Sequence, residues 1–432
     1  MLGGSIPPEY MIAASISQCA VAMFFSLRKD RNFVNPYNIN LFALILMNIG
    51  NLSLLSRIEN GTNYMYFFAS VPDIPLAAQI WCIGNSVFLV GYLAFSTQES
   101  FPSIGLKLNR SHTTFVFWFI LFLNQFSSKL AFLGPLSKAL GLVGIVGILF
   151  FARLWGAEGD KKYRNYAFVL FFFQIYHALT DSYLRFEILL PVIIFFAGYF
   201  TGKGDLKYAF TYRILPFIIA VGLFINIFSE LGKSRNHFGN AFVEVYFTET
   251  EVSEEDPEEV YDETIDRGGF FDRSATLAQV SATVKLVNAS GFYNGRASEP
   301  LLVAVVPRFL WPDKPKIALG QWFAVEIGTS TFGDAANANN SVNITIPGEL
   351  YLDFGWFGVI IGCFLFGALI CQLWNSTQFF GSHYNLIGSI YGGYMLFLAL
   401  TGVSIDLQIT VTYLSVYLVF LLIKRIAISA SK

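Results

Sequence analysis

The chain has 432 residues, of which 54% are hydrophobic, 17% aromatic and only 13% charged. So little charge cannot cover the apolar surface of a soluble protein of this size, so the composition indicates an integral membrane protein and excludes a soluble one. The formal net charge is -2, which lacks the basic excess of nucleic-acid-binding proteins and excludes nucleic acid as a partner.

Apolar stretches predict an all-α integral membrane protein with about 11 transmembrane helices, because each crossing needs about 20 mostly apolar residues. The predicted spans are residues 9–27, 38–56, 76–96, 112–127, 132–152, 165–181, 184–201, 212–229, 346–373, 385–402 and 408–424. The start of the chain lacks a basic segment followed by a small-residue cleavage site. We therefore expect the first span to be retained rather than removed as a signal peptide.

The distribution of Lys and Arg among the connections predicts the orientation of the bundle. One set of connections carries Arg28, Lys29, Arg31, Lys107, Arg110, Arg153, Lys161, Lys162, Arg164, Lys203, Lys207, Arg213, Lys424, Arg425 and Lys432. The short connections of the other set carry only Arg57, Lys129 and Arg185. Because the basic connections of membrane proteins stay in the cytoplasm, we predict that the N-terminus lies outside and the C-terminus inside.

The predicted organisation has three parts: helices 1–8 in residues 1–228, a large external loop in residues 229–345, and helices 9–11 in residues 346–432. The loop begins with an acidic insert, residues 244–266, whose composition is typical of a solvated segment. Residues 275–288 carry apolar side chains at helical spacing, which predicts an amphipathic helix that lies on the membrane. The external face thus holds the most polar part of the chain.

Basic side chains at three places on the predicted outer face are candidates for binding a phosphate group. Arg185 begins the seventh span, Asp272 and Arg273 precede the amphipathic helix, and Arg308 and Lys314 lie in a proline-rich turn. Free amides at a helix start together with a guanidinium form an anion site. An arginine close to lipid is energetically costly, so an arginine that points into the bundle is a candidate for a functional role. The alternative at each place is a side chain that anchors the chain at the membrane interface.

Glu349 is a candidate general base, because it follows Pro347 and Gly348 at the outer end of the ninth span and there faces the outer cavity. Its alternative role is a carboxylate that the helix start stabilises electrostatically. Asp353 follows one turn later, and His237 is a further possible base in a polar loop.

The cysteine residues and the known nucleotide and metal motifs bear on cofactors. Cys19, Cys82, Cys363 and Cys371 all fall inside predicted spans, which indicates buried apolar side chains rather than disulfides or metal ligands. The sequence has no nucleotide-binding glycine-rich loop and no His/Glu zinc pattern. We therefore expect no cofactor and no metal, and a substrate that arrives already activated.

Four features in order along the chain resemble the Wzy-type oligosaccharide repeat-unit polymerases, also called O-antigen polymerases. They are Arg185 at the start of a span, Asp272-Arg273 before the amphipathic helix, the run Pro-Arg-Phe-Leu-Trp-Pro-Asp-Lys-Pro at 307–315, and the pattern Thr-x-Pro-Gly-Glu-x-Tyr-x-x-Phe-Gly-Trp-x-Gly at 345–358. The resemblance covers residues 165–370, and the acidic insert 244–266 departs from the family pattern.

The resemblance implies a GT-C-like, metal-independent glycosyltransferase of the bacterial inner (cytoplasmic) membrane. Such an enzyme polymerises undecaprenyl-diphosphate-linked repeat units into O-antigen of lipopolysaccharide, capsule or exopolysaccharide. Arg185, Arg273, Arg308 and Lys314 would hold the diphosphate leaving group, because guanidinium groups bind phosphate bidentately, and Asp272 or Glu349 would accept the proton. The implied partners are lipid-linked oligosaccharides and membrane lipid, with a chain-length regulator and a flippase as candidates.

Two other functions fit the same sequence features. The first is a transferase similar to the O-antigen ligases, which joins a finished glycan to an acceptor. The second is a transporter or flippase of lipid-linked sugars; such proteins often contain paired halves with broken helices, and the sequence shows no internal repeat of that kind.

Overall fold

A computed structural model describes residues 6–30, 34–59, 69–97, 101–106, 114–119, 121–122, 143–177, 185–203, 275–299, 301, 311, 319–329, 341–379, 385–404 and 406–430. Throughout these residues the secondary structure is helical, with turns between the helices and no strand. The all-α fold predicted from the sequence is therefore confirmed for the described part of the chain.

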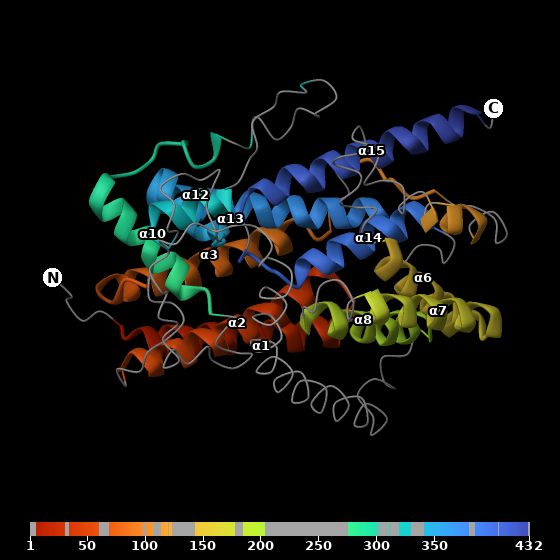
Figure 1. Ribbon diagram of the computed structural model, residues 1–432, viewed down its shortest axis with the longest axis horizontal. Helices are drawn as coiled ribbons and strands as arrows, with labels where there is room; N and C mark the ends of the chain where they lie inside the picture. Colours follow the sequence, from red (N-terminus) through yellow and green to blue (C-terminus); the bar gives the residue numbers. More distant parts are fainter. Residues whose placement is uncertain are drawn as a thin grey trace, which may run out of the picture.

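The helices lie along a common long direction, and those far apart in sequence pack side by side (Figure 1). They are α1 (Pro8–Asp30), α2 (Pro36–Glu59), the 3-10 helix η1 (Val71–Asp73), α3 (Ile74–Ala94), α6 (Val143–Glu158), α7 (Lys161–His177), α8 (Arg185–Lys203), α10 (Leu277–Ser290), α12 (Leu319–Glu326), α13 (Ile346–Thr377), α14 (Leu386–Ala399) and α15 (Gln408–Ala430).

Five helices of the described residues are long and apolar enough to cross a membrane: α1, α2, α3 with η1, α13 and α15. Large apolar side chains on their outer surfaces are exposed, among them Phe24, Phe357 and Leu422, as expected of surfaces that face lipid. These features are typical of a multi-pass membrane protein. The predicted span 212–229 lies outside the described residues, and the count of eleven spans and their orientation stay predictions.

The most extensive packing between two helices joins α3 and α13, which run in the same direction. Glycines allow the close approach, since a methyl group at Gly91 would collide with the Phe364 carbonyl and one at Gly367 with the Phe88 carbonyl. Small residues at such crossings let helix backbones meet inside a membrane, where burial from water provides no driving force. The α3–α13 pair is thus the central structural unit of the bundle.

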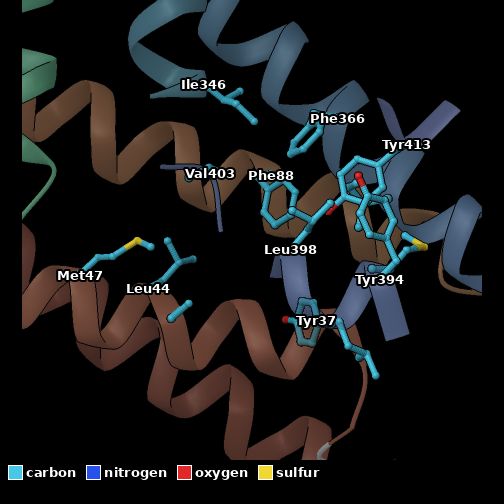
Figure 2. Close-up of a cluster of buried hydrophobic side chains, with 14 of the residues drawn as sticks. Tyr37, Leu44, Met47, Phe88, Ile346, Phe366, Tyr394, Leu398, Val403 and Tyr413 are labelled. Atoms are coloured by element: carbon cyan, nitrogen blue, oxygen red, sulfur yellow. The ribbon is translucent and has the colours of Figure 1, made fainter. Parts of the chain in front are cut away.

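Helices from both ends of the sequence build one apolar core around this pair. Figure 2 shows Leu44 and Met47 of α2, Phe88 of α3 and Leu398 of α14 as members of this core. Polar side chains also connect α1, α2 and α3: the Trp81 indole donates to Asn48 Oδ1 at 2.8 Å, and Asn48 Nδ2 donates to Ser15 Oγ at 3.1 Å. Buried hydrogen bonds of this kind fix the mutual register of the three helices.

Basic residues gather at one end of the bundle, which we call the basic end. Contacts among the ends of five helices define it: Arg153 of α6 donates to the Phe379 carbonyl after α13, Lys424 of α15 donates to the Ser103 carbonyl after α3, and Gly202 of α8 packs on Arg153. The basic residues there are Arg28, Arg153, Lys161, Lys162, Arg164, Lys203, Lys424 and Arg425. Helices α10 and α12 lie at the opposite end (Figure 1).

The predicted amphipathic helix is present as α10 and packs its apolar face on the protein, and its position relative to the membrane stays a prediction. Its predicted apolar positions Leu277, Val280, Val284 and Val287 are all buried within the protein, where α10 packs on α3 and α13. Asn51 of α2 fixes the helix start, since its Oδ1 accepts the backbone N–H groups of Thr276 at 2.8 Å and Leu277 at 2.9 Å. The periodicity indicated an apolar face correctly, but periodicity does not distinguish lipid from protein as its cover.

Candidate functional site

Helix α13 is broken at Gly355, whose φ of 59° and ψ of -146° are outside the helical region. Residues 346–354, which we call the half-helix, fold back on the residues that follow: a methyl group at Gly362 would lie 2.5 Å from Leu350. In a continuous helix, residues 12 apart are separated by about 18 Å along the axis. The predicted span 346–373 is therefore a half-helix followed by a crossing helix, and residues 356–377 alone still have the roughly 20 residues that a crossing needs.

A loop that follows α10, residues 291–298, holds the break in place. The Asp353 carboxylate accepts four hydrogen bonds from this loop: from the backbone N–H groups of Gly295 and Ala297 at 3.0 Å, and from the backbone N–H and hydroxyl of Ser298 at 2.8 and 2.5 Å. The backbone N–H of Tyr293 donates to the carbonyl of Leu352 at 2.9 Å. The loop thus donates a hydrogen bond to a backbone carbonyl that the break leaves without a partner inside the helix.

The same loop carries an aromatic and acidic surface at the end of the bundle opposite the basic end. The Tyr293 ring packs edge-on against Trp322 of α12 with 5.9 Å between centroids, and its hydroxyl donates to Glu326 at 3.2 Å. Partial burial, and then the neighbouring Glu326 carboxylate, raise the pKa of Tyr293. These contacts connect α12 to the loop that holds the α13 break.

The half-helix begins deep inside the bundle, at a segment that we call the α13 tip (345–349). Thr345 caps it, with its Oγ1 accepting the backbone N–H of Gly348 at 3.1 Å. A methyl group at Gly84, the middle residue of α3, would lie 2.9 Å from the Pro347 ring. The α13 tip therefore lies at about half the height of the bundle rather than at its surface.

Helices α14 and α15 form a hairpin whose turn reaches the same depth. The Tyr391 hydroxyl of α14 donates to the Tyr413 carbonyl of α15 at 2.9 Å, and the Tyr394 and Tyr413 rings lie 5.6 Å apart. A methyl group at Gly402 in the turn would lie 3.7 Å from Met47, near the middle of α2. We call this turn, residues 400–404 and 406–407, the α14–α15 tip.

The two tips meet through two hydrogen bonds. The backbone N–H of Ile346 donates to the Val403 carbonyl at 3.0 Å, and the backbone N–H of Leu407 donates to Glu349 Oε2 at 2.8 Å. Figure 2 shows Val403 and Phe88 in the same cluster of buried apolar side chains. Glu349 is fully buried at this contact, and its second oxygen, Oε1, has no hydrogen-bond partner. An acidic side chain in such a position is a functional candidate by default, because burial of a charge is costly.

The structure corrects the predicted position of Glu349. The sequence placed its carboxylate in an outer cavity at the end of a span, whereas the half-helix carries it to half-height. The physical reason is the break at Gly355, since the chain goes down into the bundle before α13 starts. The predicted neighbour Asp353 is also buried, and both of its oxygens are occupied by the 291–298 loop.

Of the predicted diphosphate-binding residues, only Arg185 lies within the described part of the chain. Arg185 is the first residue of α8, which matches the predicted start of a helix, and lies at the opposite end of that helix from Lys203 and the basic end; that α8 crosses the membrane stays a prediction. Its side chain is not among those described. Asp272, Arg273, Arg308, Lys314 and His237 lie outside the described residues, so their convergence stays a prediction.

Several residues at the tip contact were not predicted from the sequence. Asp406 acts electrostatically on Glu349, the Asn40 amide oxygen lies next to Gly402, and Thr410 is in the first turn of α15. A signal was present for two of them, because Asn40 and Asp406 are polar residues within or beside predicted spans, where polar side chains are rare. No sequence pattern indicated that these residues lie at the same height in the helix bundle.

Among the described residues, no group of three or more His, Cys, Asp or Glu side chains is placed to hold a metal ion. Cys19, Cys363 and Cys371 are buried, as predicted, whereas Cys82 is only partly buried. No protein-family model matches the chain, and neither a curated protein nor a solved structure matches it.

Proposed function

We propose that the protein polymerises lipid-diphosphate-linked oligosaccharide repeat units at the outer face of a bacterial inner membrane. In the reaction the bond between the anomeric carbon of the donor glycan and its diphosphate breaks, and a bond to an acceptor hydroxyl forms. The diphosphate leaves as an anion that Arg185, Arg273, Arg308 and Lys314 stabilise, since guanidinium and ammonium groups offset the developing charge. The hydroxyl proton passes to a carboxylate of the protein.

The observation that supports this proposal most is the free oxygen of Glu349. The Thr345–Gly358 pattern that resembles the polymerases folds into the half-helix, and Glu349 is the acidic residue of the α13 tip. Both Asp353 oxygens already accept hydrogen bonds, so Asp353 is not available as a base, whereas Glu349 Oε1 is. The role requires the two tips to separate far enough to admit the acceptor hydroxyl.

Replacing Glu349 by Gln tests the proposal in the native host. Gln keeps the size of the side chain but cannot accept a proton, so we expect long glycan chains to fall by at least about 100-fold, with single repeat units accumulating on lipid. Gel separation of surface polysaccharide, at equal protein level in the membrane, measures the effect.

The matched control is Glu299→Gln, because Glu299 is an exposed carboxylate directly after the 291–298 loop, and we expect it to leave the chain-length pattern unchanged. Arg308→Ala is the second arm and tests the leaving-group role. If Glu349→Gln and Arg308→Ala both produce normal long chains, the polymerase proposal is wrong.

Transport of a lipid-linked sugar is the second candidate, and the two tips that meet at half-height favour it. Discontinuous helices at this depth bind substrates and ions in many transporters. The position of the accumulated single units separates the candidates: a failed polymerase leaves them on the outer leaflet, and a failed flippase leaves them on the cytoplasmic leaflet. A ligase would instead leave complete polymers on their lipid carrier.

A further inference from the structure

Three buried oxygen atoms without a hydrogen-bond partner belong to the elements that meet at the tips. They are Glu349 Oε1 on the α13 tip, Thr410 Oγ1 in the first turn of α15, and Asn40 Oδ1 on α2 beside Gly402. Native proteins satisfy most of their buried polar atoms, because each unsatisfied one lowers the stability of the folded state. The Leu407 backbone N–H donates to the Glu349 carboxylate, and Thr410 follows Leu407 by about one helical turn, so the unpaired Glu349 Oε1 and Thr410 Oγ1 indicate a ligand that accepts lone pairs at the contact of the two tips.

The charge around Glu349 indicates the sign of that ligand. Burial, the largest effect, disfavours a negative charge on its carboxylate, and so do the neighbouring acidic groups Asp406 and Asp353. The Leu407 backbone N–H at the start of α15, which donates to Oε2, favours the ionised carboxylate. A buried carboxylate beside further acidic groups is stable in that form only when a cation accompanies it.

From these observations we propose that the junction of the two tips binds a small monovalent cation of the Na⁺ class. Glu349 Oε1 supplies the charged ligand and Thr410 Oγ1 a neutral one, next to the non-helical backbone of the α14–α15 tip. Hard cations prefer such oxygen ligands, and unwound backbone at mid-membrane depth is where transport proteins coordinate Na⁺.

A monovalent cation fits the donor set better than a divalent one. The described residues contain no cluster of three or more acidic, His or Cys side chains that is placed to share an ion. One carboxylate with neutral hydroxyl and backbone oxygens carries a formal charge that a single positive charge neutralises. In a polymerase the cation would occupy Glu349 Oε1 while the two tips are in contact and would leave before the acceptor hydroxyl enters, because one oxygen cannot hold both.

Thermal unfolding of the purified full-length protein in detergent tests the site. We expect NaCl to raise the unfolding midpoint in a saturable manner relative to equal concentrations of choline chloride, because a ligand that binds only the folded state stabilises it. Binding of radiolabelled Na⁺ to the same sample gives the stoichiometry directly.

Two variants and one control complete the experiment. Glu349→Gln abolishes the Na⁺-dependent shift, and Thr410→Val, which keeps the side-chain shape, raises the half-saturating Na⁺ concentration about 10-fold, as the loss of about 1.4 kcal/mol requires. Thr410→Val also serves if Glu349→Gln does not fold. Glu299→Gln retains the wild-type response.

Two results overturn the proposal. The first is an equal unfolding midpoint in NaCl and choline chloride at every concentration. The second is a midpoint that changes with pH but not with Na⁺ and loses its pH dependence in Glu349→Gln, which assigns the site to a proton. Neither result depends on glycan synthesis, so failure here leaves the polymerase test unaffected.

Discussion

Two buried carboxylates on the half-helix, Glu349 and Asp353, have different environments one turn apart. Asp353 faces the 291–298 loop and uses both oxygens to hold it, whereas Glu349 faces the α14–α15 tip and uses one. A carboxylate whose two oxygens both accept hydrogen bonds stabilises structure. One with an oxygen that accepts none remains able to bind a ligand or a proton. The half-helix therefore separates a structural acid from a functional candidate.

Asp353→Asn tests the structural role. An amide can accept with its oxygen but presents N–H groups to the backbone N–H groups of Gly295, Ala297 and Ser298, so part of the hydrogen bonding is lost. We expect the free energy of unfolding to fall by about 2 to 3 kcal/mol, the typical size for hydrogen bonds to a charged group. Unfolding in detergent measures this, and equal stability of Asp353→Asn and the exposed Glu299→Gln would contradict it.

At the scale of elements, the break in α13 depends on one glycine. The Gly355 backbone occupies a region of positive φ that other residues rarely adopt, and the Phe292 ring covers the place of a side chain. The break is what turns the start of α13 into a tip that reaches the middle of the bundle. Its position thus determines where Glu349 lies.

Gly355→Ala measures how much stability depends on a glycine at the break in α13. We expect a loss of about 1 to 3 kcal/mol from backbone strain, plus the displacement of Phe292, whose Cζ would lie 2.9 Å from the new methyl group. Gly291→Ala is the matched control, because Gly291 has a positive φ of 77° but open space around it. The difference in unfolding free energy between the two variants isolates the steric contribution, and no difference would mean that Phe292 moves freely.

The sequence predicted the bounds of several helices well, but it did not predict the break in α13 or the position of Glu349. Apolar length predicted α1, α2 and α3 close to their observed bounds, because a crossing helix needs little more than length and hydropathy. The α13 break was missed, since residues 346–373 were predicted as one continuous span and a glycine in a helix is common in membranes. The depth of Glu349 follows from that break, so the site position was missed with it.

At the scale of the whole molecule, charge separates the two ends of the bundle. Lys161 and its basic neighbours are at one end, and Glu299 with the loop that holds α13 is at the other. Cytoplasmic faces carry the excess of Lys and Arg, so the basic end is predicted to face the cytoplasm. Both tips lie about midway between these two ends, beside Gly84 of α3 and Met47 of α2.

Labelling of introduced cysteines checks this orientation in intact cells. We expect a membrane-impermeant maleimide to modify Glu299→Cys from outside and to modify Lys161→Cys only after the membrane is permeabilised; both positions are exposed. The wild-type protein gives the background from Cys19, Cys82, Cys363 and Cys371, of which all but Cys82 are buried. The reverse labelling pattern would invert the predicted topology.

The close α3–α13 pairing also has a consequence for biosynthesis. Gly91 contacts Phe364, and the ribosome must add roughly 270 residues between them, which takes about 15 to 55 s at typical rates of chain elongation. During that interval the glycine face of α3 has no native partner in the nascent chain. Lipid, the insertion machinery or another helix must occupy it, so the membrane-inserted N-terminal half waits in an incomplete state until the C-terminal half arrives.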